Sequence, residues 1–381
     1  MKIVHVISGL NDGGAEAVLY RLCSANESNT HTVISLSSEG KYGALLREKG
    51  FEVHWLNMPP GRLRLAALVE LYRLLRSMKP DVVQTWMYHA DLIGGIIARM
   101  AGIKHVFWGI HNSSLKIGKS RWSTIAVAYA NALLSRFIPT TIICCADKAK
   151  IVHQKKGFTS DRFVVIPNGY DINLFKPDRG AGQKLRIELG IEENIPLFGL
   201  VGRFDFQKDH LTLIKSLSLI KQRGAHFCCV LVGRDIDVNN NQLMTWLKQY
   251  DLLEEVVLLG QRNDIPIVMN AIDIHLLSSA SEAFPNVICE AMACGTPCIT
   301  TDVGDAAFIV GDTGWVVPPS NPNMFAEAIQ RALIALSNKD EWESRCVAVR
   351  NRIIEHFSLE KMTAAYQSTW REIVQNSKNF L

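Results

Sequence analysis

The chain of 381 residues lacks the features of a membrane-spanning or secreted protein. It contains no run of about 20 apolar residues, the length that a spanning helix needs. The nearest approach, residues 89–103, is interrupted by Asp91 and Arg99. The segment Met1–Gly9 turns polar too soon for a secretory signal peptide. We therefore expect a cytoplasmic protein without a membrane-spanning helix.

The sequence also lacks the spacings of common metal and dinucleotide sites. Its nine cysteines have no zinc-ligand spacing, and buried thiols in a reducing compartment explain them best. The first glycine loop, 8–16, is not G-x-G-x-x-G, and the next predicted strand, 31–37, does not end in an acidic residue. These absences disfavour a metal cluster and a nicotinamide dehydrogenase.

Positive charge is concentrated in the first half of the chain, although the net charge is only +4. Residues 1–175 hold 21 Lys and Arg against 12 Asp and Glu, whereas residues 176–381 hold 20 against 25. This asymmetry predicts an anionic partner for the first half. We do not expect nucleic acid, because the basic residues do not alternate with aromatic residues as a base-stacking groove would need.

What the chain does contain is a regular alternation of strand-like and helix-like segments, which is typical of parallel sheets with crossover helices. The predicted strands are 2–8, 31–37, 52–56, 82–85, 105–108, 141–145, 163–166, one beginning at 197, 227–232, 256–259, 274–277, 298–300 and 315–317. The predicted fold class is therefore α/β, with two Rossmann-like domains facing each other across a cleft.

We assign residues 1–175 to the first domain and residues 176–357 to the second. The last segment, 358–381, is predicted to form an amphipathic helix. Its apolar residues Met362, Tyr366, Trp370 and Ile373 recur at three- and four-residue spacing. We expect this helix to return to the first domain and pack there.

The segment 281–297 carries two carboxylates around a predicted helix start. Glu282 precedes Pro285 and Asn286, which favour helix initiation, and Glu290 lies about one turn inside the helix. Eight helical steps of about 100° return the chain to within about 80° of its start, so both carboxylates can face one cleft. The helix N-terminus suits a phosphate. A nucleotide-sugar fits this combination, and two solvated glutamates on an amphipathic helix are the alternative.

Glycine and cationic residues follow the strands of the second domain, at the edge where ligands of parallel sheets bind. Gly202 ends a predicted strand, and Arg203 and Lys208 follow it, an arrangement that can hold a diphosphate. Gly233 and the backbone of Arg262 follow two further strands and are candidates for contact with a nucleotide base. Ordinary surface cations are the alternative for each position.

Two features of the first domain occupy the corresponding edge. Gly13 and Gly14 would let the backbone approach a ligand at a helix start, although a plain tight turn is the alternative. His111 follows the predicted strand 105–108 and could bond a sugar hydroxyl or the reacting centre, although a lone histidine at a strand end is more often structural.

A basic set is predicted to form a face toward an anionic membrane or a lipid pyrophosphate acceptor. The arginines are expected to run along a leucine-rich helix, and a solvated helix face is the alternative. The set comprises Arg62, Arg64, Arg73, Arg76, Lys116 and Lys119.

Read together, these segments resemble the family-four retaining glycosyltransferases, which have the GT-B fold. The matching segments are 13–16, 166–171, 201–203 with Lys208, 281–297, 301–304 and 314–318. They cover nearly the whole chain in order, and the glutamate pair with the Phe-Pro-Asn-Val sequence between its members is specific. One departure is Ala283, because many relatives have glycine after the first glutamate.

The resemblance implies roles for the second-domain candidates. Glu282 would contact the hydroxyls of the donor sugar, and Glu290 those of the ribose. Arg203 and Lys208 would hold the diphosphate and do the work that a magnesium ion does elsewhere, so neither a metal nor another cofactor is implied. The implied donor-binding set is Gly13, Gly14, Gly202, Arg203, Lys208, Gly233, Arg262, Glu282, Phe284, Pro285, Asn286, Val287 and Glu290.

In the first domain, the resemblance implies that the loop at 13–14 closes over the phosphates and that His111 meets the transferred sugar. The implied catalytic set is therefore His111, Glu282, Arg203 and Lys208.

The sequence thus predicts a retaining, metal-independent hexosyltransferase. It would move a hexose or N-acetylhexosamine from a nucleotide-sugar, with UDP-sugar favoured, to a lipid-linked or polysaccharide acceptor in cell-surface glycan synthesis. Its predicted location is the cytoplasmic face of the inner membrane, as a peripheral protein. The alternatives are a nucleotide-sugar epimerase or hydrolase on the same fold and a non-catalytic membrane-docking module.

Overall fold

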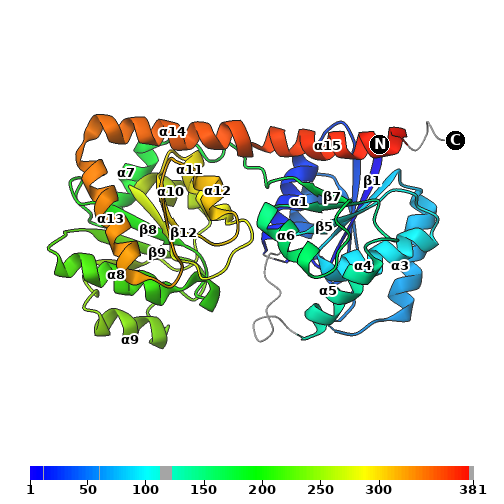
Figure 1. The fold of residues 1–381 in the computed structure, drawn as a ribbon, viewed down its shortest axis with the longest axis horizontal. Coiled ribbons are helices and arrows are strands. Elements are labelled where there is room, and N and C mark those ends of the chain that lie inside the picture. Colours follow the sequence, from blue (N-terminus) through cyan, green and yellow to red (C-terminus); the bar gives the residue numbers. More distant parts are fainter. Residues whose placement is uncertain (12, 60, 112–121, 377–381) are drawn as a thin grey trace. The chain divides into compact units, whose positions relative to one another are not determined.

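The computed structural model describes residues 1–11, 13–59, 61–111 and 122–376 (Figure 1). The chain divides into two compact units. Unit 1 comprises Met1–Gly169 and Leu359–Leu381, and unit 2 comprises Tyr170–Ser358. Each unit is a Rossmann-like α/β domain built on a parallel sheet, so the predicted α/β class with two Rossmann-like domains is confirmed.

The sheet of unit 1 has seven strands in the order β3-β2-β1-β4-β5-β6-β7, and its neighbouring strands are parallel. The strands are β1 (Lys2–Ile7), β2 (Thr30–Ser35), β3 (Glu52–Trp55), β4 (Val82–Trp86), β5 (Val106–Ile110), β6 (Thr141–Cys144) and β7 (Phe163–Val165). The helices are α1 (Gly14–Ala25), α2 (Gly40–Glu48), α3 (Leu65–Met78), α4 (Tyr88–Met100), α5 (Trp122–Leu134), α6 (Asp147–Lys155) and α15 (Leu359–Asn376). The strand order reverses between β1 and β4, and ligands of such sheets bind beyond the carboxyl ends at this point.

The sheet of unit 2 has six parallel strands in the order β10-β9-β8-β11-β12-β13. The strands are β8 (Leu197–Val201), β9 (Cys228–Val232), β10 (Val256–Leu258), β11 (Ile274–Leu277), β12 (Cys298–Thr301) and β13 (Trp315–Val317). The helices are α7 (Arg179–Glu188), the 3₁₀ turn η1 (Phe206–Lys208), α8 (His210–Gln222), α9 (Asn241–Gln249), α10 (Ile265–Ala271), α11 (Asn286–Ala293), α12 (Ala306–Val310), α13 (Pro322–Ser337) and α14 (Lys339–Phe357). Here the reversal falls between β8 and β11.

The last helix, α15, packs into the core of unit 1, as its apolar spacing predicts. Met362, Tyr366 and Trp370 are buried in one cluster with side chains of β1, β4 and α1. Trp370 also donates its indole N–H to Oε1 of Gln84 on β4, with 3.3 Å between the two atoms. Figure 1 shows α15 beside α1. The start and the end of the chain therefore build one core.

All nine cysteines are free thiols, and seven of them are buried. Burial raises the pKa of the Cys294 thiol to about 12 and that of Cys346 to about 11, so these thiols stay protonated at neutral pH. Within the described ranges, no helix combines the length and the hydropathy that crossing a bilayer requires.

We predict that Trp370→Ala destabilises unit 1 by about 3–5 kcal/mol, because it empties a fully buried site and leaves Gln84 without its donor. Hydrogen exchange of the β1 and β4 amides measures this loss for unit 1 separately. Glu372→Ala, on the exposed side of the same helix, is the control and should change protection by less than about 0.5 kcal/mol. Equal protection in the two variants would contradict the packing role of α15.

Candidate functional site

In unit 2, Lys208 and Glu282 form an ion pair in which Nζ and Oε1 are 2.7 Å apart. Lys208 ends η1 after β8, and Glu282 lies in the loop after β11, so two residues 74 positions apart meet because their strands are neighbours. Only 14% and 16% of the two side chains are exposed. Because leaving either charge enclosed without its partner would cost folding free energy, the two side chains stabilise each other.

Hydroxyl groups fix the loop that carries Glu282. Ser279 donates to the same carboxylate oxygen at 2.8 Å, and Thr301 at the end of β12 donates to the Ser279 carbonyl at 2.6 Å. Ser278 donates to the carbonyls of Lys208 and Asp209, at 3.0 Å each. These bonds join the carboxyl ends of β8, β11 and β12. Our sequence analysis missed these serines, although two adjacent hydroxyl residues directly after the predicted strand 274–277 are visible in the sequence.

Gly304 packs against the backbone of the same loop. Its φ is +51°, and a Cβ there would collide with the carbonyl oxygens of Glu282 and Ala283. The neighbouring N–H of Asp305 donates to the Ala283 carbonyl at 2.9 Å. The backbone that places Glu282 is therefore held at a distance that only glycine permits.

The helix α11 begins at Asn286, which confirms the predicted helix start. Pro285 provides no side-chain cap, and Asn286 accepts a hydrogen bond from the Tyr170 hydroxyl. The Phe284 ring is buried against Phe357, with 5.8 Å between centroids, so any contact of Phe284 with a ligand would come from its backbone. Val287 and Glu290 are half-buried along this helix.

Glycines leave the space into which the Lys208 side chain and the β8 loop fit. A Cβ at Gly202 would lie 3.1 Å from Cε of Lys208, and a Cβ at Gly233 would collide with the Gly202 carbonyl. Arg203 is half exposed, and its guanidinium lies 3.3 Å from Asp205 and 3.4 Å from Gln207. The carboxyl ends of β8 and β9 are thus in direct contact, with two cations following β8.

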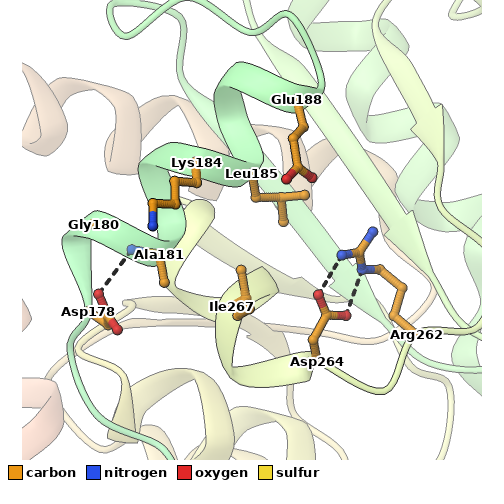
Figure 2. A pocket seen from close by; sticks show the side chains of 9 residues that line it. All are labelled: Asp178, Gly180, Ala181, Lys184, Leu185, Glu188, Arg262, Asp264 and Ile267. Carbon is orange, nitrogen blue, oxygen red and sulfur yellow. Dashed lines mark hydrogen bonds and ion pairs between the residues drawn. The ribbon is translucent and has the colours of Figure 1, made fainter.

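Arg262 is tied to Asp264 by two hydrogen bonds, one of them 2.8 Å long between Nε and Oδ1. This pair lowers the pKa of Asp264 and raises that of Arg262. The two side chains border a cavity of about 410 Å³ between α7 and α10, whose lining also includes Lys184 and Glu188 (Figure 2). Neither Lys208 nor Glu282 lines this cavity, so it is separate from their ion pair.

In unit 1, Gly13 and Gly14 begin α1 after β1. Gly13 is the N-terminal cap of the helix and provides no side-chain bond. The Glu16 carboxylate folds back over Gly13, where a Cβ would collide with it. The absence of a side chain at Gly13 therefore leaves room for the Glu16 carboxylate beside the start of α1.

His111 directly follows β5. Its Nε2 is enclosed and has no hydrogen-bond partner in the described part of the chain. Burial lowers the pKa of the imidazole to about 4, so the ring is neutral at pH 7. The strand end beside it is fixed by Asp91 of α4, whose Oδ1 accepts from the Gly109 N–H at 3.2 Å and from the Thr85 hydroxyl at 2.6 Å.

The basic set differs from its prediction in one respect. Arg73 and Arg76 lie on α3, whereas Arg62 and Arg64 precede it, because Arg64 has an extended backbone and the helix begins only at Leu65. All four arginines are exposed. Lys116 and Lys119 lie outside the described residues.

An apolar stripe on α5 was not anticipated. Trp122, Tyr129 and Leu133 follow one another at seven- and four-residue spacing, which places them on one side of the helix. They are 75%, 51% and 76% exposed. The indication was present in the sequence as helical spacing, but spacing alone does not tell a buried face from an exposed one.

Two family models match the chain. One is described as Glycosyltransferase Family 4 and matches residues 12–174. The other is described as Glycosyl transferases group 1 and matches residues 182–345.

A curated relative from Escherichia coli, UDP-Gal:alpha-D-GlcNAc-diphosphoundecaprenol alpha-1,3-galactosyltransferase, is 26% identical over 321 residues, which are 82% of this chain and 80% of the relative. Among solved structures, HepE of Anabaena in complex with UDP superimposes with a TM-score of 0.84 at 23% identity, covering 98% of this chain and all of that one. Sucrose-phosphate synthase of Thermosynechococcus elongatus gives 0.80 at 20% identity, covering 99% of this chain and all of that one.

We predict that Gly304→Ala destabilises unit 2 by about 1–3 kcal/mol more than Gly190→Ala does, because overpacking adds to the strain of a positive φ. Both glycines have positive φ, but a Cβ at Gly190 would meet nothing within 4 Å. Urea denaturation of the two variants measures the difference. Equal losses would show that the approach to the Glu282 and Ala283 carbonyls has no energetic consequence.

Proposed function

Because the chain belongs to the family-four glycosyltransferases, which have the GT-B fold, we propose that it is a retaining enzyme that moves a hexose or N-acetylhexosamine from a UDP-sugar to a lipid-linked acceptor. The observation that carries this proposal is the enclosed ion pair of Lys208 and Glu282 at the strand-order reversal of unit 2. A diphosphate needs a fixed cation, and a sugar needs a fixed hydrogen-bond acceptor, and this pair supplies both.

In the proposed complex, the donor binds to unit 2. Lys208 and Arg203 contact the diphosphate, and the N-terminus of α11 adds the positive end of its dipole. Glu282 accepts hydrogen bonds from sugar hydroxyls, while Glu290 takes the ribose. The backbones of Gly233 and Arg262 contact the base. The Arg262 side chain does not, because it is bonded to Asp264.

The proposed reaction is a front-face displacement. The bond between the anomeric carbon and the β-phosphate oxygen breaks, and the acceptor oxygen bonds the same carbon on the same face. The acceptor proton passes to the departing phosphate oxygen, so the products are the glycoside and UDP. Lys208 and Arg203 stabilise the charge that develops on the diphosphate, which is a preorganised electrostatic role that needs no metal.

The choice of a lipid-linked acceptor has two supports. The E. coli relative is named for a diphosphoundecaprenol substrate. Unit 1 exposes both the four arginines around α3 and the apolar stripe of α5, the combination that binds anionic lipid surfaces. We therefore propose that unit 1 receives the acceptor and that the protein is peripheral on the cytoplasmic face of a membrane.

A donor screen tests the reaction. We expect a UDP-sugar to raise the melting temperature of the protein more than GDP- or ADP-sugars do, because a ligand that binds only the folded state stabilises it. Transfer from that donor to a polyprenyl-diphosphate-linked sugar, analysed by NMR, should give a product with the donor's anomeric configuration. Donor consumption without acceptor would indicate a hydrolase or an epimerase, and no nucleotide affinity would indicate a docking module.

In the same assay, Lys208→Ala should lower turnover by about 100-fold or more, because it removes a cation from the leaving group. Since the substitution also removes the cation beside the enclosed Glu282 carboxylate, urea denaturation of Lys208→Ala and of Lys208→Met/Glu282→Gln measures the stability that the uncompensated charge costs. Lys248→Ala, on the exposed side of α9, is the control. Turnover near that of the wild type in Lys208→Ala would refute the assignment of the diphosphate site.

For the lipid face, we expect Tyr129→Ser/Leu133→Ser and the fourfold alanine variant of Arg62, Arg64, Arg73 and Arg76 each to weaken binding to phosphatidylglycerol vesicles. The arginine effect should fade in high salt, because exposed charges are screened, whereas the α5 effect should persist. Ile334→Ser, an exposed apolar position on α13 of unit 2, is the control. Unchanged vesicle sedimentation in both variants would remove the membrane face, and UDP affinity should stay constant throughout.

A further inference from the structure

The imidazole of His111 stacks on the indole ring of Trp86. The rings of Trp86 and His111 are stacked, with centroids 5.0 Å apart and planes 17° from parallel. Trp86 ends β4, His111 follows β5, and the two strands are neighbours in the sheet. Trp86 is completely buried, so the surface under His111 is fixed by the core and not by solvent.

A chain of buried hydrogen bonds fixes the indole in turn. The Trp86 Nε1–H donates to Nδ1 of His5 on β1 at 3.1 Å, so this nitrogen of His5 must carry a lone pair. The proton of the neutral His5 therefore sits on Nε2, which lies 2.9 Å from Nδ1 of His31 on β2. Burial, together with the nearby His31, lowers the pKa of His5, and burial lowers that of His31 to about 4, so both rings are neutral.

The same histidines could be read as a metal site. Within the described residues, His5, Cys23 and His31 bring one ligand atom each to within 4.8 Å of one another. Coordination through His5 would need a lone pair on Nε2, but that nitrogen holds the proton directed at His31 as long as Trp86 donates to Nδ1. Metal binding would thus break the bond that holds the indole, and the hydrogen-bond chain is the better account of these residues.

Two further features hold Trp86 in place: the C-terminal helix α15 and the strained residue Met87. Tyr366 of α15 is also nearly parallel to Trp86, with centroids 6.0 Å apart and an angle of 21°. Met87, next to Trp86, has a φ of +71° and donates its N–H to the Gly109 carbonyl at 2.8 Å. A positive φ at a residue other than glycine costs about 1–3 kcal/mol and persists where the surroundings impose it. This strain lies at the link between Trp86 and the strand that carries His111.

We propose that Trp86 is a positioning residue for His111, and that His5, His31 and Tyr366 act through it. This inference rests on the proposed function, in which His111 meets the transferred sugar. Stacking fixes the plane of the imidazole and so limits the directions in which its Nε2 can meet a hydroxyl. The partner rings carry no charge that would draw a proton onto His111, because burial also raises the pKa of Tyr366.

The test compares Trp86→Leu with Trp108→Leu. Both tryptophans are fully buried in unit 1, but only Trp86 is stacked on His111. We expect Trp86→Leu to lower kcat by about 10- to 100-fold while the KM for the donor changes by less than about threefold, because loss of orientation acts on the reacting geometry. Trp108→Leu should lower the melting temperature comparably and leave kcat within about threefold. Trp86→Phe, which keeps a flat ring, should recover most of the rate.

A second readout is independent of activity. Nitrogen-15 NMR of the imidazole rings should show His111 neutral and in one tautomer from pH 5 to 8 in the wild type, with a pKa of about 4. In Trp86→Leu, the pKa should rise toward 6.5 and the tautomers should average, whereas Trp108→Leu should resemble the wild type. An unchanged His111 spectrum in Trp86→Leu would overturn the proposal.

His111→Ala separates this proposal from the proposed function. If His111→Ala lowers kcat but Trp86→Leu behaves like Trp108→Leu, the positioning role is wrong and the role of His111 stands. If His111→Ala leaves kcat unchanged, the role of His111 in transfer is wrong, and the positioning of catalysis by Trp86 falls with it.

Discussion

The constraint on which this molecule depends is that the strands within each sheet run in one direction. Parallel strands put all their carboxyl ends at one edge, and the loops that leave this edge are brought together regardless of their distance along the chain. Lys208 and Glu282 in unit 2 meet in this way, and so do Trp86 and His111 in unit 1. In both units, the strands concerned are adjacent at or beside the reversal of the strand order.

The two units differ in the charge of the side chains at this edge. Unit 2 presents formal charges that are paired and enclosed. Unit 1 presents a neutral ring at this edge, because burial keeps the His111 imidazole deprotonated at pH 7. A charged pair suits a diphosphate, whereas a neutral imidazole suits a hydroxyl that must be both bonded and released.

Sequence reasoning found the elements whose signals are local. The strands, with ends predicted to within two residues, the start of α11 at Asn286 and the packing stripe of α15 all follow from spacing and residue type. It did not find Ser279, the Arg262–Asp264 pair or the bond from Trp86 to His5, which joins residues 81 positions apart. The bond from Trp86 to His5 depends on strand register, which a short window does not contain. The bonds of Ser279 and Arg262 join residues two or three positions apart and depend on the loop backbone and on the side-chain rotamer. The arginines at 62 and 64 were placed on a helix because a leucine pattern does not mark where the first turn begins.

The return of α15 to unit 1 has a consequence for biosynthesis. The segment Tyr170–Ser358 is continuous, so unit 2 can reach its final form on the ribosome before the chain is complete. Unit 1 begins first but lacks Met362, Tyr366 and Trp370 from its core until translation reaches them. The apolar surface of unit 1 that α15 covers therefore stays uncovered until the ribosome has translated all of unit 2.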